Sequence, residues 1–289
     1  MSLQTAQVSP AKAPSRGRVS LAWGRWGLRA AAVGYLALMI VLPLSAILVN
    51  GASGGPAAFW QDITNPVAYA ALKLTVFTAV ITTAVNVFMG TLTAYVLVRY
   101  DFPGRGLLNA VVDMPFAIPT LVTGVMLVLL YGPQSTLGAW LEGGGVRVIF
   151  NTPGIVLALL VVTYPFVIRT VQPVLMELDR SQEEAAYTIG ASKWTTFRTI
   201  ILPAISPAVV TGSLLCFARA LGEFGSIVVV AGNIPRRTLT APVYVYGQLE
   251  SYNQRGASSM SVLLLALSFT IILVVDWMQK RWNIAYATP

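Results

Sequence analysis

The residue types that most often carry out chemistry are scarce in this chain. It contains no histidine and a single cysteine, Cys216, which lies inside an apolar run. A disulfide within the chain and a cysteine metal site are therefore excluded, and the commonest general base is missing. No segment has the phosphate-binding pattern G-x-x-x-x-G-K-[ST], so ATP hydrolysis has no location in this chain. We expect no catalytic residue, no metal site and no cofactor bound by the chain itself.

Three charged residues inside apolar runs are the remaining candidates for function. Arg219 and Glu223 are four positions apart, so they would share a face of a helix. Arg219 could contact a passing anion while Glu223 holds its orientation, or the two could form an ion pair that maintains helix packing. Asp113 could pair with Arg105 or with Arg169, as a gate or as a structural bond. The sequence leaves these alternatives open.

The elements that must position these charges are membrane-spanning helices. Hydrophobic residues make up 56% of the 289 positions and charged residues only 10%, against roughly 25% charged in soluble proteins. The apolar residues form long blocks, and about 20 of them cross a bilayer as a helix. Backbone groups in hydrocarbon must pair within the segment, so we predict an all-α membrane protein with six transmembrane helices. The predicted spans are residues 30–49, 74–98, 107–131, 153–171, 207–231 and 257–275.

The basic residues predict the orientation of these spans. Thirteen of the nineteen Lys and Arg fall on one side, and four, Arg147, Arg236, Arg237 and Arg255, fall on the other. The positive-inside rule then places both termini in the cytoplasm. We predict a disordered basic tail over residues 1–29, a six-helix domain over 30–278 and a C-terminal tail over 279–289. A cleaved signal peptide fits less well, because the first apolar run is too long. The basic residues form no face interleaved with aromatic residues, so nucleic-acid binding is not indicated.

The cytoplasmic loop over residues 172–206 has a regular pattern of helix signals. Ser181 followed three residues later by Glu184 reads as a capping box at the start of a short helix. This helix is expected to run through Ile189 and to end where Gly190 adopts a left-handed conformation. The loop therefore begins with one short, well-delimited helix.

A second short helix is predicted after this glycine. Ser192 can cap its start, and Pro203 and Pro207 are expected to end it and turn the chain into the next span. Ala185 and Ala186 in the first helix are small enough for close docking. The two helices could lie in a groove of a soluble partner or rest on the membrane surface.

The spacing within this loop resembles the EAA signature of ABC importer permeases. The positions that match are Glu184, Ala185, Ala186, Gly190, Ile200, Leu202 and Pro203. The resemblance implies that the loop docks into a separate ATPase subunit, which binds ATP and Mg. It also implies that the first four of these residues make the coupling contact.

Further segments are similar to the sulfate/thiosulfate permease family, and most similar to its T-type (U-type) branch. The matching segments are residues 63–66, 99–105, 113–117, 165–173, 221–225 and 231–234. The resemblance implies the type I ABC importer (MetI-like) permease fold in a bacterial cytoplasmic (inner) membrane. It implies as partners a second, homologous W-type permease, two copies of an ATPase subunit, an external sulfate-binding protein and membrane lipids.

Three other functions can be compared with the sequence. Molybdate and tungstate permeases, or those for other oxyanions, share the EAA loop and a similar Leu-Gly-Glu-Phe-Gly run. A secondary transporter or channel usually shows internal repeats or matched interrupted helices, which we do not find in the sequence. A membrane enzyme would need catalytic groups that the chain lacks. We therefore expect an ATP-driven importer subunit that is not itself an enzyme.

Overall fold

The chain is helical throughout the part that the structure describes. The structure is a computed structural model, and it describes residues 21–287. No strand occurs among these residues, which confirms the predicted all-α fold class. The chain divides into two compact units, residues 1–46 and residues 47–289.

The first unit carries the start of the first predicted span. It contains α1 (Leu21–Leu36) and a π-helical turn, η1 (Ala37–Val41), which continues into α2 (Leu42–Ala52). The segment Trp26–Ala52 is long and apolar enough to cross a membrane, which confirms this span. Residues 1–20 of the predicted tail lie outside the described residues. Residues 21–29 are helical, where the prediction had a disordered tail.

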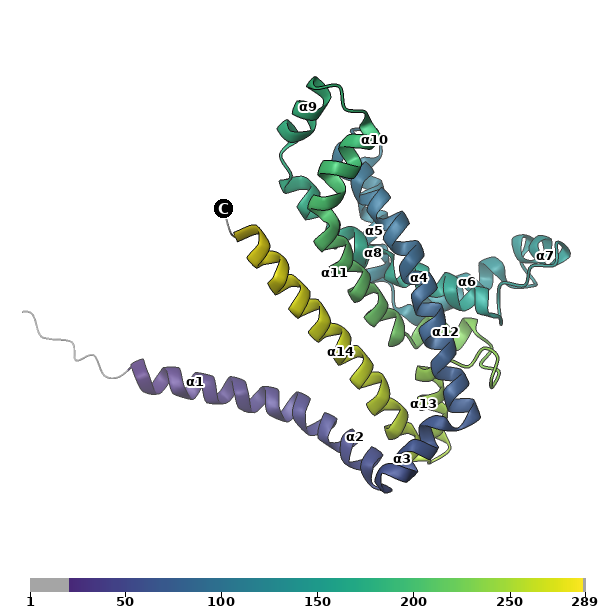
Figure 1. Ribbon diagram of the computed structural model, residues 1–289. Helices are drawn as coiled ribbons and strands as arrows, with labels where there is room; N and C mark the ends of the chain where they lie inside the picture. Colours follow the sequence, from purple (N-terminus) through teal and green to yellow (C-terminus); the bar gives the residue numbers. More distant parts are fainter. Residues whose placement is uncertain (1–20, 288–289) are drawn as a thin grey trace, which may run out of the picture. The chain divides into compact units, whose positions relative to one another are not determined.

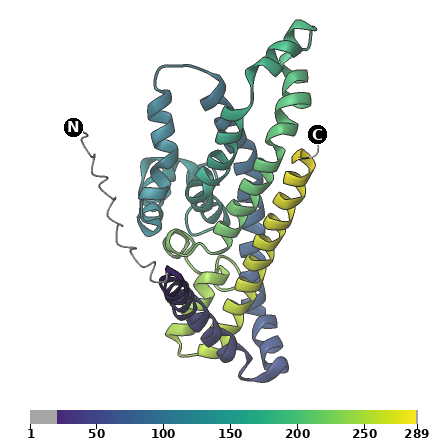
Figure 2. The ribbon, with the colours of Figure 1, turned by 90° about the vertical axis from the view of Figure 1, so that its left-hand side faces the viewer.

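The second unit is built around four long helices, which can be followed in Figures 1 and 2. These are α4 (Pro66–Arg99), α8 (Thr152–Glu177), α11 (Leu202–Leu221) and α14 (Gln254–Ala287). Helix α8 packs against both α4 and α11, and α11 also packs against α14. The shorter elements are α3 (Gly55–Thr64), α5 (Arg105–Ala117), α6 (Thr120–Tyr131), α7 (Thr136–Gly143), α9 (Arg180–Thr188), α10 (Lys193–Thr196), η2 (Phe197–Ile201), α12 (Gly225–Val230) and α13 (Ala241–Glu250).

The interface of α4, α8 and α11 combines an apolar core with a small polar cluster. Leu97, Ile168 and Ile205 are at most 1% exposed. Deeper in the same interface, Asn86 Nδ2 donates to Thr163 Oγ1 at 2.9 Å. Hydrogen bonds of this kind hold helices together where the surrounding lipid supplies no partner. The three helices therefore form the frame on which the other elements are placed.

Two of the long helices extend beyond the predicted spans, α4 at its start and α14 at its end. Helix α4 has 34 residues and begins eight residues before the predicted start at residue 74, because Asn65 accepts the N–H of Val67 and Pro66 occupies the first helical position. Helix α14 continues to Ala287, so residues 279–287 of the predicted C-terminal tail are helical. The extension of α4 is mostly apolar and begins at its cap, whereas the extension of α14 beyond residue 275 contains several polar residues, which hydropathy does not mark.

The third predicted span, residues 107–131, is not one straight helix. It is broken into α5 and α6, whose axes differ by 112°. Pro119 stands directly before α6, where its ring fixes the backbone and its missing N–H cannot continue α5. Of the two prolines in this span, Pro115 lies inside α5 and Pro119 stands at the break between the two helices. Five unbroken helices and this bent pair make up to six candidate spans among the described residues.

The fifth predicted span, residues 207–231, is displaced along the chain. The helix runs from Lys193 to Leu221, stops, and resumes as α12. Pro203 and Pro207 therefore lie within it, and the prediction that they separate a loop helix from the span is wrong. The π-helical turn η2 directly precedes them, and such a turn accommodates backbone groups that proline leaves unpaired.

Candidate functional site

The start of α9 differs in one detail from its prediction. Its N-cap is Asp179, whose side chain accepts the N–H of Ser181 at 2.9 Å, so Ser181 is not the cap. This hydrogen bond lowers the pKa of Asp179, because it stabilises the ionised carboxylate. Asp179 and Ser181 are both good capping residues, and the chain uses the earlier one. The predicted capping box between Ser181 and Glu184 is therefore wrong.

The end of α9 has the predicted form. Gly190 has a φ of +87°, in the left-handed region. Its N–H donates to the carbonyl of Tyr187, and the N–H of Ala191 donates to the carbonyl of Ala186, both at 3.0 Å. This pair of bonds is the Schellman motif. Ser192 then caps α10 by accepting the N–H of Thr195 at 3.1 Å, as expected.

The residues of the EAA-like signature separate into two groups. Glu184 and Ala185 are exposed on α9, and Ile189 beside them is 86% exposed. Ala186 is buried on the opposite face of α9, against the body of the loop. The remaining matched residues, Ile200, Leu202 and Pro203, lie on η2 and α11 and form the continuation from the loop into the membrane helix. The two short helices lie together at one end of the second unit (Figure 1).

A buried ion pair ties α9 to the end of α4. Arg99 Nη2 lies 2.6 Å from Glu183 Oε1, and their side chains are only 7% and 10% exposed. Two further bonds cross the same junction: Arg99 Nη2 donates to the carbonyl of Leu178 at 3.3 Å, and Arg180 Nη2 donates to the carbonyl of Val98 at 3.2 Å. The loop and α4 are therefore joined by three polar contacts at one point.

Sequence reasoning missed this pair. It assigned the acidic role to Glu184, the residue that matches the signature, and left Glu183 without a role. The available signal was the pair of adjacent carboxylates, Glu183 and Glu184. Successive residues of a helix point in different directions, so only one of the two could face a partner in the rest of this protein.

Arg169 is the partner of Asp113, which selects one of the two predicted alternatives. Arg169 Nη2 lies 2.6 Å from Asp113 Oδ2, and its Nη1 donates to the side chains of Asn109 at 3.0 Å and Gln172 at 2.6 Å. Arg105 instead pairs with Asp101 on the surface. The Arg169 network joins α8 to α5, and both charges remain partly exposed.

Arg219 and Glu223 also form an ion pair, but across the end of a helix. Arg219 Nη1 lies 2.7 Å from Glu223 Oε2, with the Arg219 side chain 33% exposed and the Glu223 side chain 1% exposed. Helix α11 ends at Leu221, so the prediction that both residues share one helix is wrong. Glu223 Oε1 also accepts the N–H and the hydroxyl of Ser226 at 2.8 and 2.9 Å. Glu223 therefore bridges the end of α11 and the start of α12.

The break after α11 lies against the break before α6. A Cβ placed on Gly225 would collide with Thr120 Oγ1, and one on Gly124 would lie 2.7 Å from the carbonyl oxygen of Ser226. Glycine at both positions permits this close approach of α6 and α12. The two interrupted helices thus meet next to the Arg219–Glu223 pair.

Comparisons with known proteins agree with this architecture. The family described as "binding-protein-dependent transport system inner membrane component" matches residues 86–283. A bacterial alginate ABC transporter, solved in complex with an alginate pentasaccharide-bound periplasmic protein, aligns with a TM-score of 0.76 at 16% identity, covering 90% of this chain and 94% of that chain. The methionine ABC transporter MetNI aligns with a TM-score of 0.55 at 20% identity, covering 75% of this chain and 98% of that one. Both likenesses concern the fold alone, and they confirm the type I importer permease fold.

Two curated relatives are similar over most of their length. The probable sulfate transport system permease protein cysT of Chlorokybus atmophyticus is 42% identical over 246 residues, which are 85% of this chain and 86% of that protein. The sulfate transport system permease protein CysT of Escherichia coli K12 is 40% identical over 249 residues, 86% of this chain and 90% of that protein. The chain belongs to the family of inner-membrane permease components of binding-protein-dependent ABC importers, and it is a multi-pass membrane transport subunit, not an enzyme.

Proposed function

We propose that this chain is a permease subunit of an ATP-driven importer for sulfate and thiosulfate. The relatives named for sulfate transport support the substrate. The observation that carries the ATP-driven mechanism is the exposed helix α9, which presents Glu184 and Ala185 and is joined to α4 through Arg99 and Glu183. A separate ATPase subunit would bind this helix and supply ATP and Mg.

The fold offers two routes by which a movement of the loop reaches the membrane helices. The Arg99–Glu183 pair couples α9 to α4, because a buried ion pair resists separation in a low-dielectric interior. The second route is covalent, since α10, η2 and α11 form one helix from Lys193 to Leu221. This helix has 29 residues and is about 43 Å long at 1.5 Å per residue. Closure of the ATPases would therefore be transmitted to the far end of α11.

At that far end lies the contact between the broken helices α6 and α12. A rotation of α11 would move Arg219, and with it Glu223, which holds the start of α12. We propose that this junction opens and closes the anion path. Backbone N–H groups, hydroxyls and water would line the path, because a bare anion cannot cross hydrocarbon. Glu223 offsets part of the positive charge of Arg219, so the arginine would attract a dianion without holding it tightly.

The remaining partners follow from this assignment. A second, homologous W-type permease would complete the path, two copies of the ATPase subunit would dock at the α9 end, and a sulfate-binding protein would deliver the anion at the other. The chain would reside in the inner membrane of a bacterium. The distribution of basic residues supports an orientation in which both termini lie on the cytoplasmic side.

The test is uptake of labelled sulfate by cells that lack this chain, with and without the wild-type gene restored. We expect uptake only in the restored cells, competition by thiosulfate, and loss of uptake on ATP depletion. Restored uptake of molybdate or tungstate without sulfate would keep the importer and change its substrate. Sulfate uptake that persists after ATP depletion would contradict the mechanism.

A further inference from the structure

Every donor of the Arg169 side chain is occupied. A guanidinium group carries five N–H bonds. Nε and Nη2 donate to the two carboxylate oxygens of Asp113, at 2.7 and 2.6 Å. Nη1 donates to the side chains of Asn109 and Gln172, and Nη2 also donates to the backbone carbonyl of Asn109 at 3.1 Å. Four of the five contacts therefore go to α5, and the carboxylate of Asp113 fills one two-pronged edge of the guanidinium.

The pair of Arg169 and Asp113 lies at membrane depth and is nevertheless exposed. Arg169 is eight residues, about 12 Å, before Glu177, the last residue of α8, and Asp113 is equally far from Arg105, the first residue of α5. The side chains of Arg169 and Asp113 are 28% and 50% exposed. Charges are costly in hydrocarbon, so at this depth they face water or the interior of a bundle. The exposed side of this pair therefore does not face lipid.

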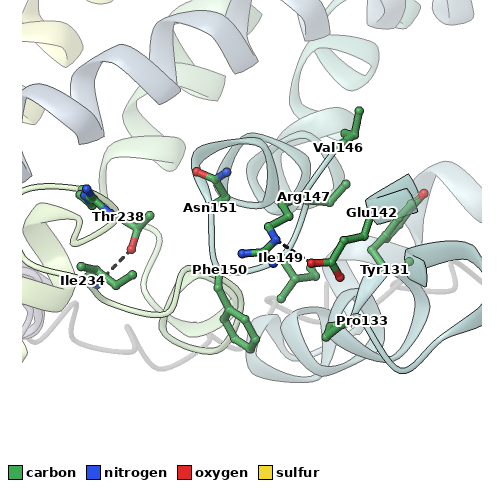
Figure 3. Close-up of a pocket in the computed structure, with 13 residues that line it drawn as sticks. Tyr131, Pro133, Glu142, Val146, Arg147, Ile149, Phe150, Asn151, Ile234 and Thr238 are labelled. Carbon is green, nitrogen blue, oxygen red and sulfur yellow. Dashed lines mark hydrogen bonds and ion pairs between the residues drawn. The ribbon is translucent and has the colours of Figure 1, made fainter. Parts of the chain in front are cut away.

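An ion pair at the opposite end of α8 shows the contrast. Arg147 Nε lies 2.6 Å from Glu142 Oε1 at the edge of a hollow of about 600 Å³ (Figure 3). The Arg147 side chain is 75% exposed, and it lies in the loop before α8, where water solvates both charges. A pair in water needs no further partners, whereas Arg169 has a full set. The arrangement around Arg169 is therefore specific to a charge held inside the membrane.

Helix α5 is attached to the second unit mainly through these contacts. Among the described elements its principal neighbour is α8, and Val112 is its only buried residue. At its end the chain turns by 112° into α6, and Pro119 cannot continue the backbone hydrogen bonds of α5. A movement of α5 away from α8 would therefore separate Asp113 from Arg169 and uncover the guanidinium.

We propose that Arg169 binds the transported anion at the cytoplasmic end of the path, and that Asp113 displaces it. While the path is shut, Asp113 occupies the guanidinium. When α5 moves away, two oxygens of the dianion take the place of the two carboxylate oxygens, because a guanidinium binds both kinds of oxyanion in the same bidentate way. Asp113 stays tethered nearby, so its high effective concentration drives the anion off as α5 returns. The inference rests on the proposed function and names the residues that release its substrate.

The test is equilibrium binding of labelled sulfate to the purified complete importer in lipid nanodiscs, without nucleotide or binding protein. The wild type should bind sulfate weakly, because Asp113 occupies Arg169. Asp113→Asn removes the competing charge, and we expect the dissociation constant to fall at least about tenfold. Adding Arg169→Gln should abolish this gain. A purely structural ion pair predicts no gain, so an unchanged dissociation constant in Asp113→Asn would overturn the inference.

Asp101→Asn is the matched control. It removes the acidic partner of Arg105 at the exposed start of α5 and should leave sulfate binding unchanged. Asp113→Ser, which also removes the carboxylate, should give the same gain as Asp113→Asn, and thermal melting checks that both complexes are folded. A gain that survives Arg169→Gln, or an equal gain in Asp101→Asn, would overturn the inference.

Failure of the proposed function has a different signature. Wild-type importer in proteoliposomes, supplied with ATP and sulfate-loaded binding protein, should take up sulfate. If it takes up none, the proposed function is overturned, and this inference with it. Normal uptake by the wild type together with no gain in Asp113→Asn would overturn this inference alone.

Discussion

Arg99, the last residue of α4, and Glu183, in the first turn of α9, form an ion pair that is almost completely buried. The pair joins the C-terminal end of one helix to the N-terminal end of another. A cation at a C-terminus and an anion at an N-terminus each complement the helix dipole, so both charges are favourably placed before they meet. The contact makes α4 and α9 a single mechanical unit.

The first prediction concerns this pair. Arg99→Gln and Glu183→Gln should each abolish sulfate uptake and lower the melting temperature of the complex, because each leaves a buried charge without a partner, at a cost of about 3–5 kcal/mol. The charge swap Arg99→Glu/Glu183→Arg should restore part of the uptake. Arg105→Gln, which breaks an exposed pair with Asp101, should change stability by less than about 1 kcal/mol. Equal uptake by the wild type and both single variants would refute a coupling role.

The second prediction concerns the turn between α9 and α10. Nothing lies within 4 Å of a Cβ placed on Gly190, so a substitution there acts through the backbone alone. Gly190→Val should reduce uptake strongly, since a left-handed conformation costs a β-branched residue at least about 1–2 kcal/mol. Gly190→Asn should retain most uptake because asparagine tolerates this conformation. If valine and asparagine behave alike in the uptake assay, the left-handed turn does not matter.

The third prediction separates the two roles of the Arg219–Glu223 pair. Glu223→Ala removes the acceptor of both Ser226 hydrogen bonds and should destabilise the protein by about 1–3 kcal/mol. Arg219→Gln/Glu223→Gln should melt closer to the wild type than Arg219→Gln alone, because no unpaired charge remains. Thermal melting in detergent and sulfate uptake are measured together. Normal uptake by Arg219→Gln would eliminate a role for this arginine in attracting the anion.

The fourth prediction concerns the contact between the two interrupted helices. Gly225→Ala should force α6 and α12 apart, because the added methyl meets Thr120 Oγ1 and the backbone nitrogen of Leu121. Such overpacking costs about 1–3 kcal/mol and should reduce uptake. Gly222→Ala is the matched control, since nothing lies within 4 Å of the methyl that it adds. A comparable loss of stability and uptake in both variants would show that the contact is not the cause.

Hydropathy predicted that the spans exist but not how they bend. Residues 107–131 form one predominantly apolar segment, and hydropathy does not distinguish a straight helix from two helices at 112°. The effect of a proline also depends on its surroundings: Pro119 stands at a break, whereas Pro203 follows a π-helical turn inside a continuous helix. Local sequence does not settle which outcome a proline has.

Local signals succeeded where the interaction itself is local. Gly190 and Ser192 act within a few residues of their own position, and both have the predicted roles. The choice of Asp179 over Ser181 as the cap of α9 was missed, since both residues, two positions apart, were suitable. The partner of Glu183 could not be identified, because Arg99 is 84 positions away and only the fold brings the two together.

The central claim is that α9 binds an ATPase subunit. Its most direct test is a cross-link from α9, because the chain has only one cysteine, and Cys216→Ala provides a cysteine-free background. With Ala185→Cys added and its thiol labelled with benzophenone-4-maleimide, ultraviolet irradiation should link this chain to the ATPase subunit in membranes. The exposed position Val146, changed to cysteine as a control, should give no such link. Absence of the Ala185 cross-link in an importer that still transports sulfate, or equal linkage from Val146, would contradict the account.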